Sequence, residues 1–225
     1  MDLIETVRTT GAIREFLPDP VADDTLARIL DNARFAPSGG NRQGWHVVVV
    51  KDVATRAALR DLYLPGWYEY LAQRGAGLTP WAPITDRTAE AEAIASADSV
   101  PRGEGFPENL DRVPVLLVLL ADLRALAAVD RDLPRYTFAG GASVYPFAWN
   151  LLLAARAEGL GGVITTMAIG READVKSLLG APDELAVAAV IALGCPVHQP
   201  RKLTREPVSS FTTVDRVIGA PFVGS

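Results

Sequence analysis

The chain of 225 residues contains a single cysteine and two histidines, and it has no excess of positive charge. Cys195 has no second thiol with which to form an intramolecular disulfide, which favours a reducing compartment. His46 and His198 lie far apart in sequence and have no cysteine or carboxylate at metal-ligand spacing, so no metal site is expected. The net charge of −5 argues against nucleic-acid binding, because no basic stripe is available to neutralise phosphates.

The sequence also lacks long apolar runs and several common catalytic motifs. Its longest apolar runs reach about half the length of a membrane span, and no basic segment leads into an apolar stretch at the N-terminus. We therefore expect a cytoplasmic protein with no membrane association. The Gly-x-Ser-x-Gly elbow of serine hydrolases and the phosphate-binding P-loop are both missing. Gly159, Gly161 and Gly162 follow a helix instead of a strand, which argues against a Rossmann dinucleotide site.

The residues that are present have an ordinary globular composition, with 49% apolar and 22% charged, and they fit a single domain, 1–225. Hydrophobic periodicity and helix-stop signals predict three helices. The first begins near 23 and ends before Pro37, and the other two span about 144–158 and 171–179. Continuous apolar runs predict strands at 46–50, 115–120, 162–165 and 186–193. Because such strands are apolar on both faces, we expect a sheet covered on both sides, in an α+β or α/β sandwich.

The segment 64–109 differs from the rest, because prolines and glycines alternate there with isolated aromatic residues. The aromatic residues are Trp67, Tyr68, Tyr70, Trp81 and Phe106. A long stretch without regular structure inside a compact domain is typical of a lid, a binding loop or a partner-contacting excursion. We expect a lid or an insertion here, with aromatic side chains that stack on a flat ligand or anchor the loop to the body.

The most informative segment is the turn at 36–45, between a predicted helix and a predicted strand. Pro37 and the glycines that follow it stop the helix and leave backbone N–H groups free. Asn41 and Gln43 add side-chain amides that both donate and accept hydrogen bonds. Such a turn suits the polar edge of a planar heterocycle or a phosphate group. The alternative is an ordinary loop between a helix and a strand.

Four blocks of the sequence, in the right order and spacing, resemble the nitroreductase family of flavin mononucleotide (FMN) enzymes. The blocks are 12–16 followed by Pro20 and Val21, 33–45, 150–155 with 158–161, and 192–196 with basic residues downstream. The resemblance extends over nearly the whole chain. It implies a nitroreductase-like α+β sandwich with a central mixed sheet flanked by helices. It also implies an intertwined homodimer in which each FMN is contacted by both chains.

The resemblance further implies a ping-pong oxidoreductase cycle through N5 of the flavin. The electrons come from NADH, NADPH or a reduced deazaflavin, and a nitroaromatic, a quinone or another unsaturated small molecule accepts them. The cofactor carries this chemistry, so no catalytic side chain is expected, only backbone near Thr166 and Met167. The alternatives on the same fold are a dehalogenating or flavin-consuming enzyme, and a flavin-binding storage or sensor protein with little turnover.

Carried over position by position, the resemblance implies three groups of cofactor-binding residues. Arg14 would contact the phosphate or the ribityl chain of FMN through its planar fork of donors, unless it forms a surface ion pair with Glu15. The turn and the end of the third predicted strand would line the flavin with Pro37, Ser38, Gly39, Asn41, Gln43, Ile164, Thr165, Thr166 and Met167. Arg205, with Arg201 or Lys202, would complete the phosphate site or belong to a solvated tail.

The first block departs from the family pattern at the phosphate end. Thr10, Gly11 and Ala12 stand where family members usually carry an arginine-rich pair and a serine. Arg8 is the nearest extra arginine, so either Arg8 or hydroxyl and backbone donors would replace the missing groups. Thr166 also stands where many members carry an acidic residue. These departures leave the tuning of the flavin and the identity of the electron donor open.

Overall fold

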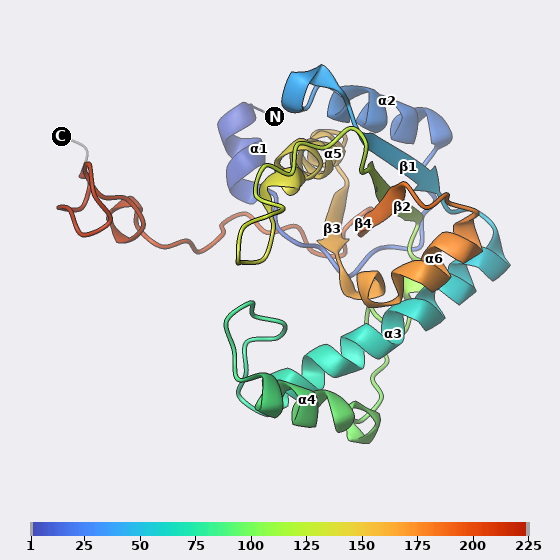
Figure 1. Ribbon diagram of the computed structural model, residues 1–225. Coiled ribbons are helices and arrows are strands. Elements are labelled where there is room, and N and C mark those ends of the chain that lie inside the picture. Colours follow the sequence, from blue (N-terminus) through green and yellow to red (C-terminus); the bar gives the residue numbers. More distant parts are fainter. Residues whose placement is uncertain (1, 224–225) are drawn as a thin grey trace.

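The computed structural model describes residues 2–223 and shows one sheet with helices on both faces, from which a pair of helices projects (Figure 1). The helices are α1 (Leu3–Thr9), α2 (Asp23–Ala33), α3 (Val53–Gly75), α4 (Arg87–Ala95), α5 (Tyr145–Ala157) and α6 (Glu172–Leu179). The strands are β1 (Trp45–Val49), β2 (Val115–Asp122), β3 (Gly161–Thr165) and β4 (Leu185–Gly194). Three of the short 3-10 helices bear on the site: η1 (Gly39–Asn41), η4 (Ala139–Ser143) and η5 (Met167–Arg171). No helix in the described part of the chain is long and apolar enough to cross a membrane.

The sheet has the strand order β1-β2-β4-β3, and its three ladders are antiparallel. The expected α+β class is confirmed, but the sheet is antiparallel where a mixed sheet was expected. Residues 50–114 leave the sheet at the end of β1 and come back to the same edge of the sheet at the start of β2. This is shown by the pairing of Val49 at the end of β1 with Leu117 near the start of β2. Within residues 2–223, a parallel pairing occurs only as an isolated bridge between Ala12 and Gly162 of β3.

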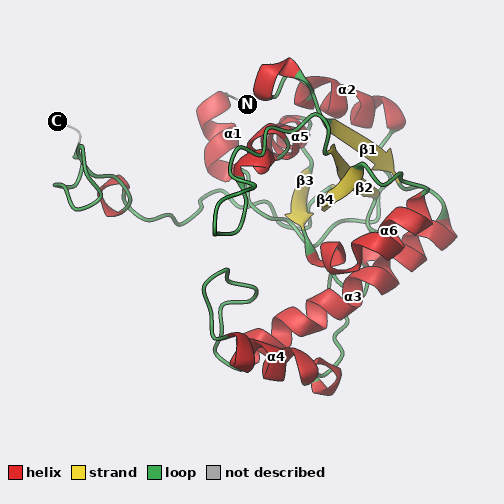
Figure 2. Cartoon of the chain, viewed as in Figure 1, coloured by secondary structure: helices red, strands yellow, loops and turns green. Residues whose placement is uncertain are grey.

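Both faces of the sheet are covered, as the apolar strands predict (Figure 2). Alternate residues of β2 point to opposite faces, so Leu117 and Leu119 pack with α2 and α5 in one core. Leu116, Val118 and Leu120 belong to a second core with α3, η5 and α6. These leucine and valine side chains of β2 are fully buried or nearly so. The two cores fix the position of β3, whose C-terminal end leads into the candidate site.

The three helices predicted from the sequence are present as α2, α5 and α6. α2 buries Leu26, Ile29 and Ala33 at helical spacing. α5 and α6 are each followed by a glycine in the left-handed region, Gly159 at φ 82° and Gly180 at φ 64°, where a residue without a Cβ is favoured. The glycine stops therefore located α5 and α6 to within one residue, whereas α2 ends at Ala33, about three residues before the expected end.

About half of the segment 64–109 is helical, and the expectation of a stretch without regular structure is wrong. α3 begins at an N-cap, Asp52, which accepts a hydrogen bond from the Thr55 backbone at 2.8 Å. It then continues through Pro65 and Gly66, two residues that usually interrupt a helix. The helix is maintained because Leu59 and Tyr63 on one side of Pro65, and Tyr68 on the other, are buried against their surroundings. Tertiary packing thus overrides the local propensity.

The connection between β2 and α5 is organised by one buried carboxylate, Asp130, which is 3% exposed. Its oxygens accept hydrogen bonds from the Phe138 backbone at 2.9 Å and from the Thr137 hydroxyl at 2.7 Å. Further donors are the Arg135 guanidinium at 2.8 Å and the Ala139 backbone at 3.2 Å. These donors, the Phe138 backbone first, hold the pKa of Asp130 far below its usual range.

Replacing Asp130 with asparagine should therefore lower the melting temperature at neutral pH. A carboxylate with a depressed folded pKa stabilises the fold above its unfolded pKa of about 3.9, and this contribution is lost as the pH falls through the folded pKa. The difference in melting temperature between wild type and Asp130→Asn should then be constant from neutral pH to about pH 5 and narrow at lower pH. Calorimetric melts across this range measure the difference. A difference that widens on acidification would contradict the stated role of Asp130.

The C-terminal segment leaves the body after about residue 200 and ends in a small hairpin away from it (Figure 1). The hairpin is closed by a bridge between Thr213 and Pro221 and by a backbone hydrogen bond from Phe222 to Thr212. Its apolar side chains are open to solvent, with Val217 94% and Ile218 92% exposed. Exposed apolar patches are typical of protein or membrane interaction surfaces.

Candidate functional site

The turn before β1 has an unusual backbone. Gly40, Asn41 and Gln43 all lie in the left-handed region, at φ 62°, 52° and 50°. Glycine and asparagine adopt this conformation readily, whereas for glutamine it costs about 1 kcal/mol. Strain of this kind persists where the surrounding structure fixes it and is concentrated at functional sites.

Hydrogen bonds and stacking fix this turn to α5 and its entry. The Gly39 backbone N–H donates to the Ser143 hydroxyl at 3.0 Å, and the Gln43 backbone N–H donates to the Ser38 hydroxyl at 2.9 Å. Trp45, directly after the turn, stacks on Phe147 of α5 with ring centroids 5.0 Å apart. The turn is therefore rigid, and the Asn41 and Gln43 amides are exposed at its surface.

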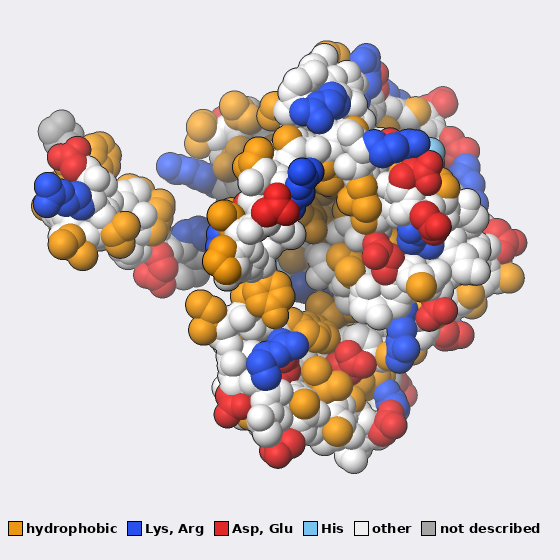
Figure 3. Space-filling view, viewed as in Figure 1, with side chains coloured by type: hydrophobic (Ala, Val, Ile, Leu, Met, Phe, Trp, Pro, Cys, Tyr) orange, Lys and Arg blue, Asp and Glu red, His pale blue; other side chains and the backbone are white. Residues whose placement is uncertain are grey.

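A second feature is a basic cavity where α1 meets the start of the C-terminal segment. The cavity has a volume of about 490 Å³ and is lined by Val7, Arg8, Arg201, Lys202, Leu203 and Arg205. Within residues 2–223, none of its four cationic side chains takes part in an ion pair. Figure 3 shows Lys and Arg side chains gathered where the C-terminal segment leaves the body. Unpaired cations brought together in one cavity favour an anion, above all a phosphate.

Contacts between α1 and the C-terminal segment explain how Arg8 reaches this cavity. The Gln199 side-chain amide donates to the Thr9 carbonyl at 2.8 Å. A Cβ at Gly11 would lie 3.0 Å from the Leu203 side chain, so the two segments pack closely at a residue without a side chain. The structure thus brings Arg8 together with Lys202 and Arg205, three of the candidate residues named from the sequence.

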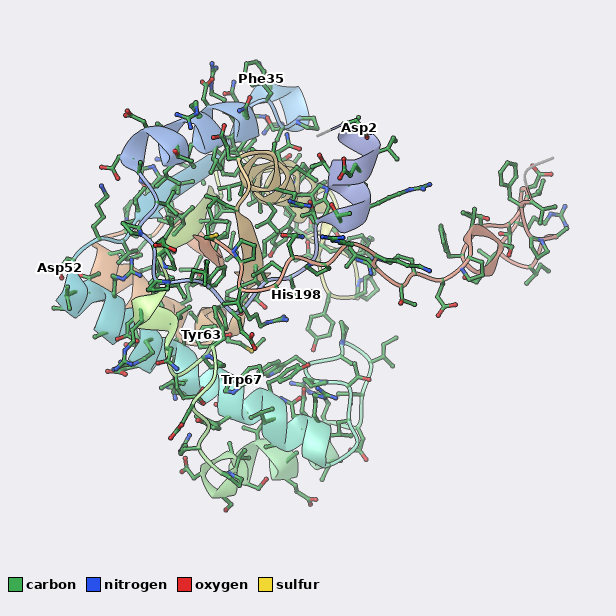
Figure 4. The ribbon with its side chains drawn as sticks, turned by 180° about the vertical axis from the view of Figure 1, so that it is seen from behind. Asp2, Phe35, Asp52, Tyr63, Trp67 and His198 are labelled. Carbon is green, nitrogen blue, oxygen red and sulfur yellow. The ribbon has the colours of Figure 1, made fainter. Side chains whose placement is uncertain are left out.

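A third feature is the C-terminal end of β3, where Ile164 and Thr165 close the strand and Thr166 and Met167 begin η5. The Tyr63 hydroxyl of α3 lies 3.0 Å from the Thr165 hydroxyl. Burial raises the pKa of Tyr63, and the hydrogen bond to Thr165 and the nearby charge of Arg14 oppose part of this rise. Figure 4 shows Tyr63 and Trp67 on the part of α3 that lies against the body.

α3 approaches this strand end very closely. A Cβ at Gly66 would lie 2.5 Å from the Met167 carbonyl oxygen, so only glycine allows this contact. Next to it is a cavity of about 320 Å³, lined by Gly66, Glu69, Trp81, Thr166, Met167, Ile169 and Gly170. The cavity is mostly apolar and suits one face of a planar ring. Glu69 and Trp81 were not singled out as site residues from the sequence, because their proximity to Thr166 depends on α3 continuing through Pro65 and Gly66.

Arg14 is not in the basic cavity. It lines a separate cavity of about 250 Å³ with Phe16, Asn109 and Arg112 among its neighbours. The preceding residue, Ile13, donates its backbone N–H to the Gly162 carbonyl of β3 at 2.9 Å, so Arg14 lies beside β3, and its charge acts on Tyr63. Arg14 therefore lies toward the strand end, whereas Arg8 and Arg205 lie toward the C-terminal segment.

Within one chain, the turn at 37–43 lies apart from the basic cavity and from the C-terminal end of β3. Figure 1 shows the turn after α2 at the end of the body away from α3, whereas the end of β3 faces α3. None of the cavities described above that contain Arg8, Arg14 or Thr166 has a lining residue from 37–43. Among the described residues, no three His, Cys, Asp or Glu side chains come together as metal ligands. The site groups of one chain are thus a phosphate-sized basic cavity, a ring-sized apolar cavity and a separate rigid polar turn.

Comparison with known sequences shows which proteins this chain resembles. The sequence profile of the Nitroreductase family matches residues 7–195. An "NADH dehydrogenase" of Thermus thermophilus is 32% identical over 191 residues, which cover 84% of this chain and 83% of that protein. A "5,6-dimethylbenzimidazole synthase" of Rhodospirillum rubrum is 28% identical over 198 residues, covering 82% of this chain and 77% of that protein.

Solved structures show the same fold at lower identity. A BluB-like flavoprotein from Clostridium difficile 630 aligns with a TM-score of 0.68 at 20% identity, covering 96% of this chain and 100% of that one. An iodotyrosine deiodinase bound to FMN and 3-iodo-L-tyrosine aligns with a TM-score of 0.63 at 22% identity, covering 92% of this chain and 96% of that one. At these identities the likeness concerns the fold, which is of the nitroreductase type.

Proposed function

Since this chain belongs to the nitroreductase family and is an oxidoreductase, we propose that it binds FMN and passes electrons from a reduced nicotinamide to an unsaturated acceptor. The acceptor is a nitroaromatic, a quinone or a related small molecule, and the cycle is ping-pong. The observation that carries the proposal is the basic cavity at Arg8, Lys202 and Arg205, whose cations have no carboxylate partner within residues 2–223.

The cationic side chains and free backbone N–H groups of the chain fit the two ends of FMN. A phosphate dianion would neutralise the crowded cations of the basic cavity, and Arg8 takes the role that Thr10, Gly11 and Ala12 cannot fill. At the other end, the first backbone N–H groups of η5 have no acceptor within that helix, and Met167 donates to no acceptor outside it among the described residues. These N–H groups and the apolar cavity beside Thr166 suit the polar edge and the face of a flavin ring.

The residues of this chain then bind and orient the cofactor. FMN, when bound, supplies the two-electron chemistry at N5, so the protein needs no acid or base of its own for that step. Arg8, Lys202 and Arg205 would hold the phosphate, and Ile164, Thr165, Thr166 and Met167 would lie against the ring. α3, packed on Met167 through Gly66, would exclude water from one side of this region.

Arg14 belongs to this proposal as a contact near the ring end or the ribityl chain, because it lies on the side of Tyr63 and Thr165. Replacing Arg14 with alanine should lower the affinity for FMN and for riboflavin by the same factor, roughly ten- to a hundredfold, because a charge-assisted contact is removed. Equilibrium dialysis with each flavin measures both affinities. If the affinity for FMN fell while that for riboflavin did not change, Arg14 would bind the phosphate instead.

The projecting region 64–109, which contains α4 and most of α3, is proposed as the lid that sets acceptor choice. Trp81 and Glu69 of this region line the cavity beside Thr166, so the region borders the place where an acceptor would bind. NADH, NADPH and a reduced deazaflavin remain the proposed donors.

A shared site explains why the turn lies apart from the other groups. We propose that Pro37, Ser38, Gly39, Asn41 and Gln43 of one chain line the flavin held by the other chain of a homodimer. The exposed apolar residues of α1 and the C-terminal hairpin supply surface for such an interface, with Leu3 71% and Phe211 69% exposed. A closed dimer would bury these residues on both copies.

The names of two similar proteins favour second candidates on the same fold. The relative from Rhodospirillum rubrum is a 5,6-dimethylbenzimidazole synthase, and one structural neighbour is an iodotyrosine deiodinase. A flavin-consuming enzyme would lose its flavin during turnover, and a dehalogenase would release halide without reducing nitro compounds. A storage or sensor protein would keep its flavin and turn over slowly with every donor.

Anaerobic stopped-flow spectroscopy separates these functions. With the proposed function, NADH or NADPH bleaches the blue absorbance of the bound flavin, and a nitroaromatic or quinone restores it in a second mixing step. Each half-reaction gives its own rate and can be read as a free-energy change. If neither nicotinamide nor reduced deazaflavin bleached the flavin, the oxidoreductase cycle proposed here would be excluded.

A further inference from the structure

A further cavity lies where α4 packs beside α3 (Figure 1). It has a volume of about 490 Å³ and is called the α3–α4 groove here. Its walls are one face of α3, the C-terminal end of α4, the 3-10 helix η2 (Ala97–Ser99) and Arg171 at the end of η5. Of the residues that line this groove and the cavity beside Thr166, only Glu69 is common to both. The groove is therefore a separate cavity, with a volume typical of small-molecule sites, which range over about 300–1,000 Å³.

Some of the charged side chains in the groove already have a partner. The Arg60 guanidinium lies 2.8 Å from the Asp61 carboxylate. The Arg102 guanidinium lies 3.6 Å from the Asp98 carboxylate and 3.9 Å from the centre of the Tyr68 ring. These charges compensate one another and leave little net charge for a ligand.

Glu69 and Arg171 are the groove charges that remain uncompensated. Within residues 2–223, neither side chain takes part in an ion pair. The Glu69 carboxylate accepts no hydrogen bond there either, since only its backbone carbonyl is used, by the Gln73 amide. The two side chains carry opposite charges and line the same groove, yet they do not reach each other. A ligand with one positive and one negative end complements this arrangement.

The packing of α3 on η5 fixes where these two charges lie. A Cβ at Gly66 would lie 2.5 Å from the Met167 carbonyl oxygen, so the two elements are in direct backbone contact. Glu69 follows Gly66 by about one helical turn, and Arg171 closes the short helix that Met167 begins. The positions of the carboxylate and the guanidinium along the groove are therefore set by rigid elements, although their side chains remain free to adjust.

The rest of the groove offers an apolar wall. Leu64 and Pro65 of α3 and Ile94 of α4 line it beside the charged groups. Tyr68 below them is 2% exposed, and its hydroxyl donates to Glu108 of the segment that follows α4. The wall suits an aliphatic group attached next to the charged ends of the ligand.

We propose that the α3–α4 groove binds a free α-amino acid with an apolar side chain. Its ammonium group lies at Glu69, its carboxylate lies at Arg171, and its side chain packs on Leu64 and Ile94. An α-amino acid carries both charges and the side chain on one carbon, which matches two opposite charges beside an apolar wall. The proposal does not rest on the proposed function, because the groove and its charges belong to the chain with or without a cofactor.

Three probes with one shared carbon skeleton test the proposal by isothermal titration calorimetry on the purified protein. L-Leucine carries both charges, 4-methylpentanoate carries only the carboxylate, and 3-methylbutylamine carries only the ammonium group. Leucine should bind at least about tenfold more tightly than either of the other two, because each of them lacks one charge-assisted contact.

Two variants assign each charge to its residue. In Glu69→Gln, the affinities for leucine and 3-methylbutylamine should fall about tenfold, and the affinity for 4-methylpentanoate should not fall. In Arg171→Gln, leucine and 4-methylpentanoate should lose affinity, and 3-methylbutylamine should keep it. The probe that each variant still binds shows that the groove is intact. Glu92→Gln and Arg131→Gln remove exposed charges outside the groove and should leave the three affinities unchanged.

Three results would each overturn the proposal. Leucine could bind no more tightly than the singly charged probes, both variants could weaken every probe equally, or none of the probes could bind. The last result is expected if Glu69 and Arg171 close on each other as a direct ion pair. Flavin content is read separately from the visible spectrum, so failure of FMN binding is distinguished from failure of the amino-acid site.

Discussion

Replacing Arg8 and Arg205 together with alanine should lower the affinity for FMN by about a hundredfold to ten-thousandfold, because two charge-assisted contacts to phosphate are lost. Affinity for riboflavin should be nearly unchanged, because riboflavin lacks the phosphate and shares the rest of the molecule. The ratio of the two affinities therefore reports the phosphate contacts alone. Neither arginine is in the hydrophobic cores, so the fold should be retained.

Equilibrium dialysis of wild type and variant with each flavin measures this ratio. A matched control, Lys51→Ala with Arg131→Ala, removes the same positive charge from two exposed positions elsewhere on the chain. This control should keep the wild-type ratio of affinities. If the control and the test variant lost FMN equally, general electrostatic attraction would explain the loss, and the basic cavity would not be the phosphate site.

Deleting residues 207–225 should convert the proposed dimer into a monomer and release most of the flavin. The deletion removes the hairpin with Phe211, Val217, Ile218 and Phe222, which are largely exposed in the single chain. Burying several such side chains against a partner contributes about 1.5–3 kcal/mol each, so their loss should raise the dimer dissociation constant at least a thousandfold. Flavin is lost with the dimer because a monomer has no second chain whose turn at 37–43 could line the flavin.

Light scattering after size-exclusion chromatography gives the mass of each species, and the visible spectrum gives its flavin content. Val53→Ser serves as the control, because Val53 is 81% exposed at the start of α3 and lies outside the proposed interface. This variant should remain a dimer with its flavin. A wild-type protein that held flavin as a clean monomer, or a truncated protein that stayed a dimer, would contradict the shared site.

Much of the body could be predicted from the sequence because local and global signals agree there. The apolar face of α2 and the glycines after α5 and α6 located these three helices, and the continuous apolar runs located β1 to β4. α3 was missed because Pro65 and Gly66 indicate a break, and only the burial of Tyr63 and Tyr68 around them shows that the helix continues. The antiparallel order of the sheet depends on where the chain returns to it after residues 50–114, and no local sequence pattern predicts that position.

The candidate site likewise contains residues that the sequence identified and residues that only the packing identifies. Arg8 could be named because the positions after it lack the usual arginines, and its contacts with the C-terminal segment then place it beside Lys202 and Arg205. Arg14 was expected at the phosphate or the ribityl chain of FMN, and its position near Tyr63 depends on the packing of α3 against β3. Glu69 looks like an ordinary exposed helix residue until Gly66 brings α3 onto Met167. Residues fixed by tertiary packing were therefore the ones that sequence patterns did not find.

The visible absorption spectrum of the purified, extensively dialysed protein tests the central claim most directly. The account predicts the absorbance of oxidised flavin in the blue region, with FMN identified by mass after extraction and present in stoichiometric amount with the chain. Anaerobic addition of NADH or NADPH should bleach this absorbance. A colourless protein that failed to take up added FMN, with both the basic cavity and the dimer intact, would contradict the account.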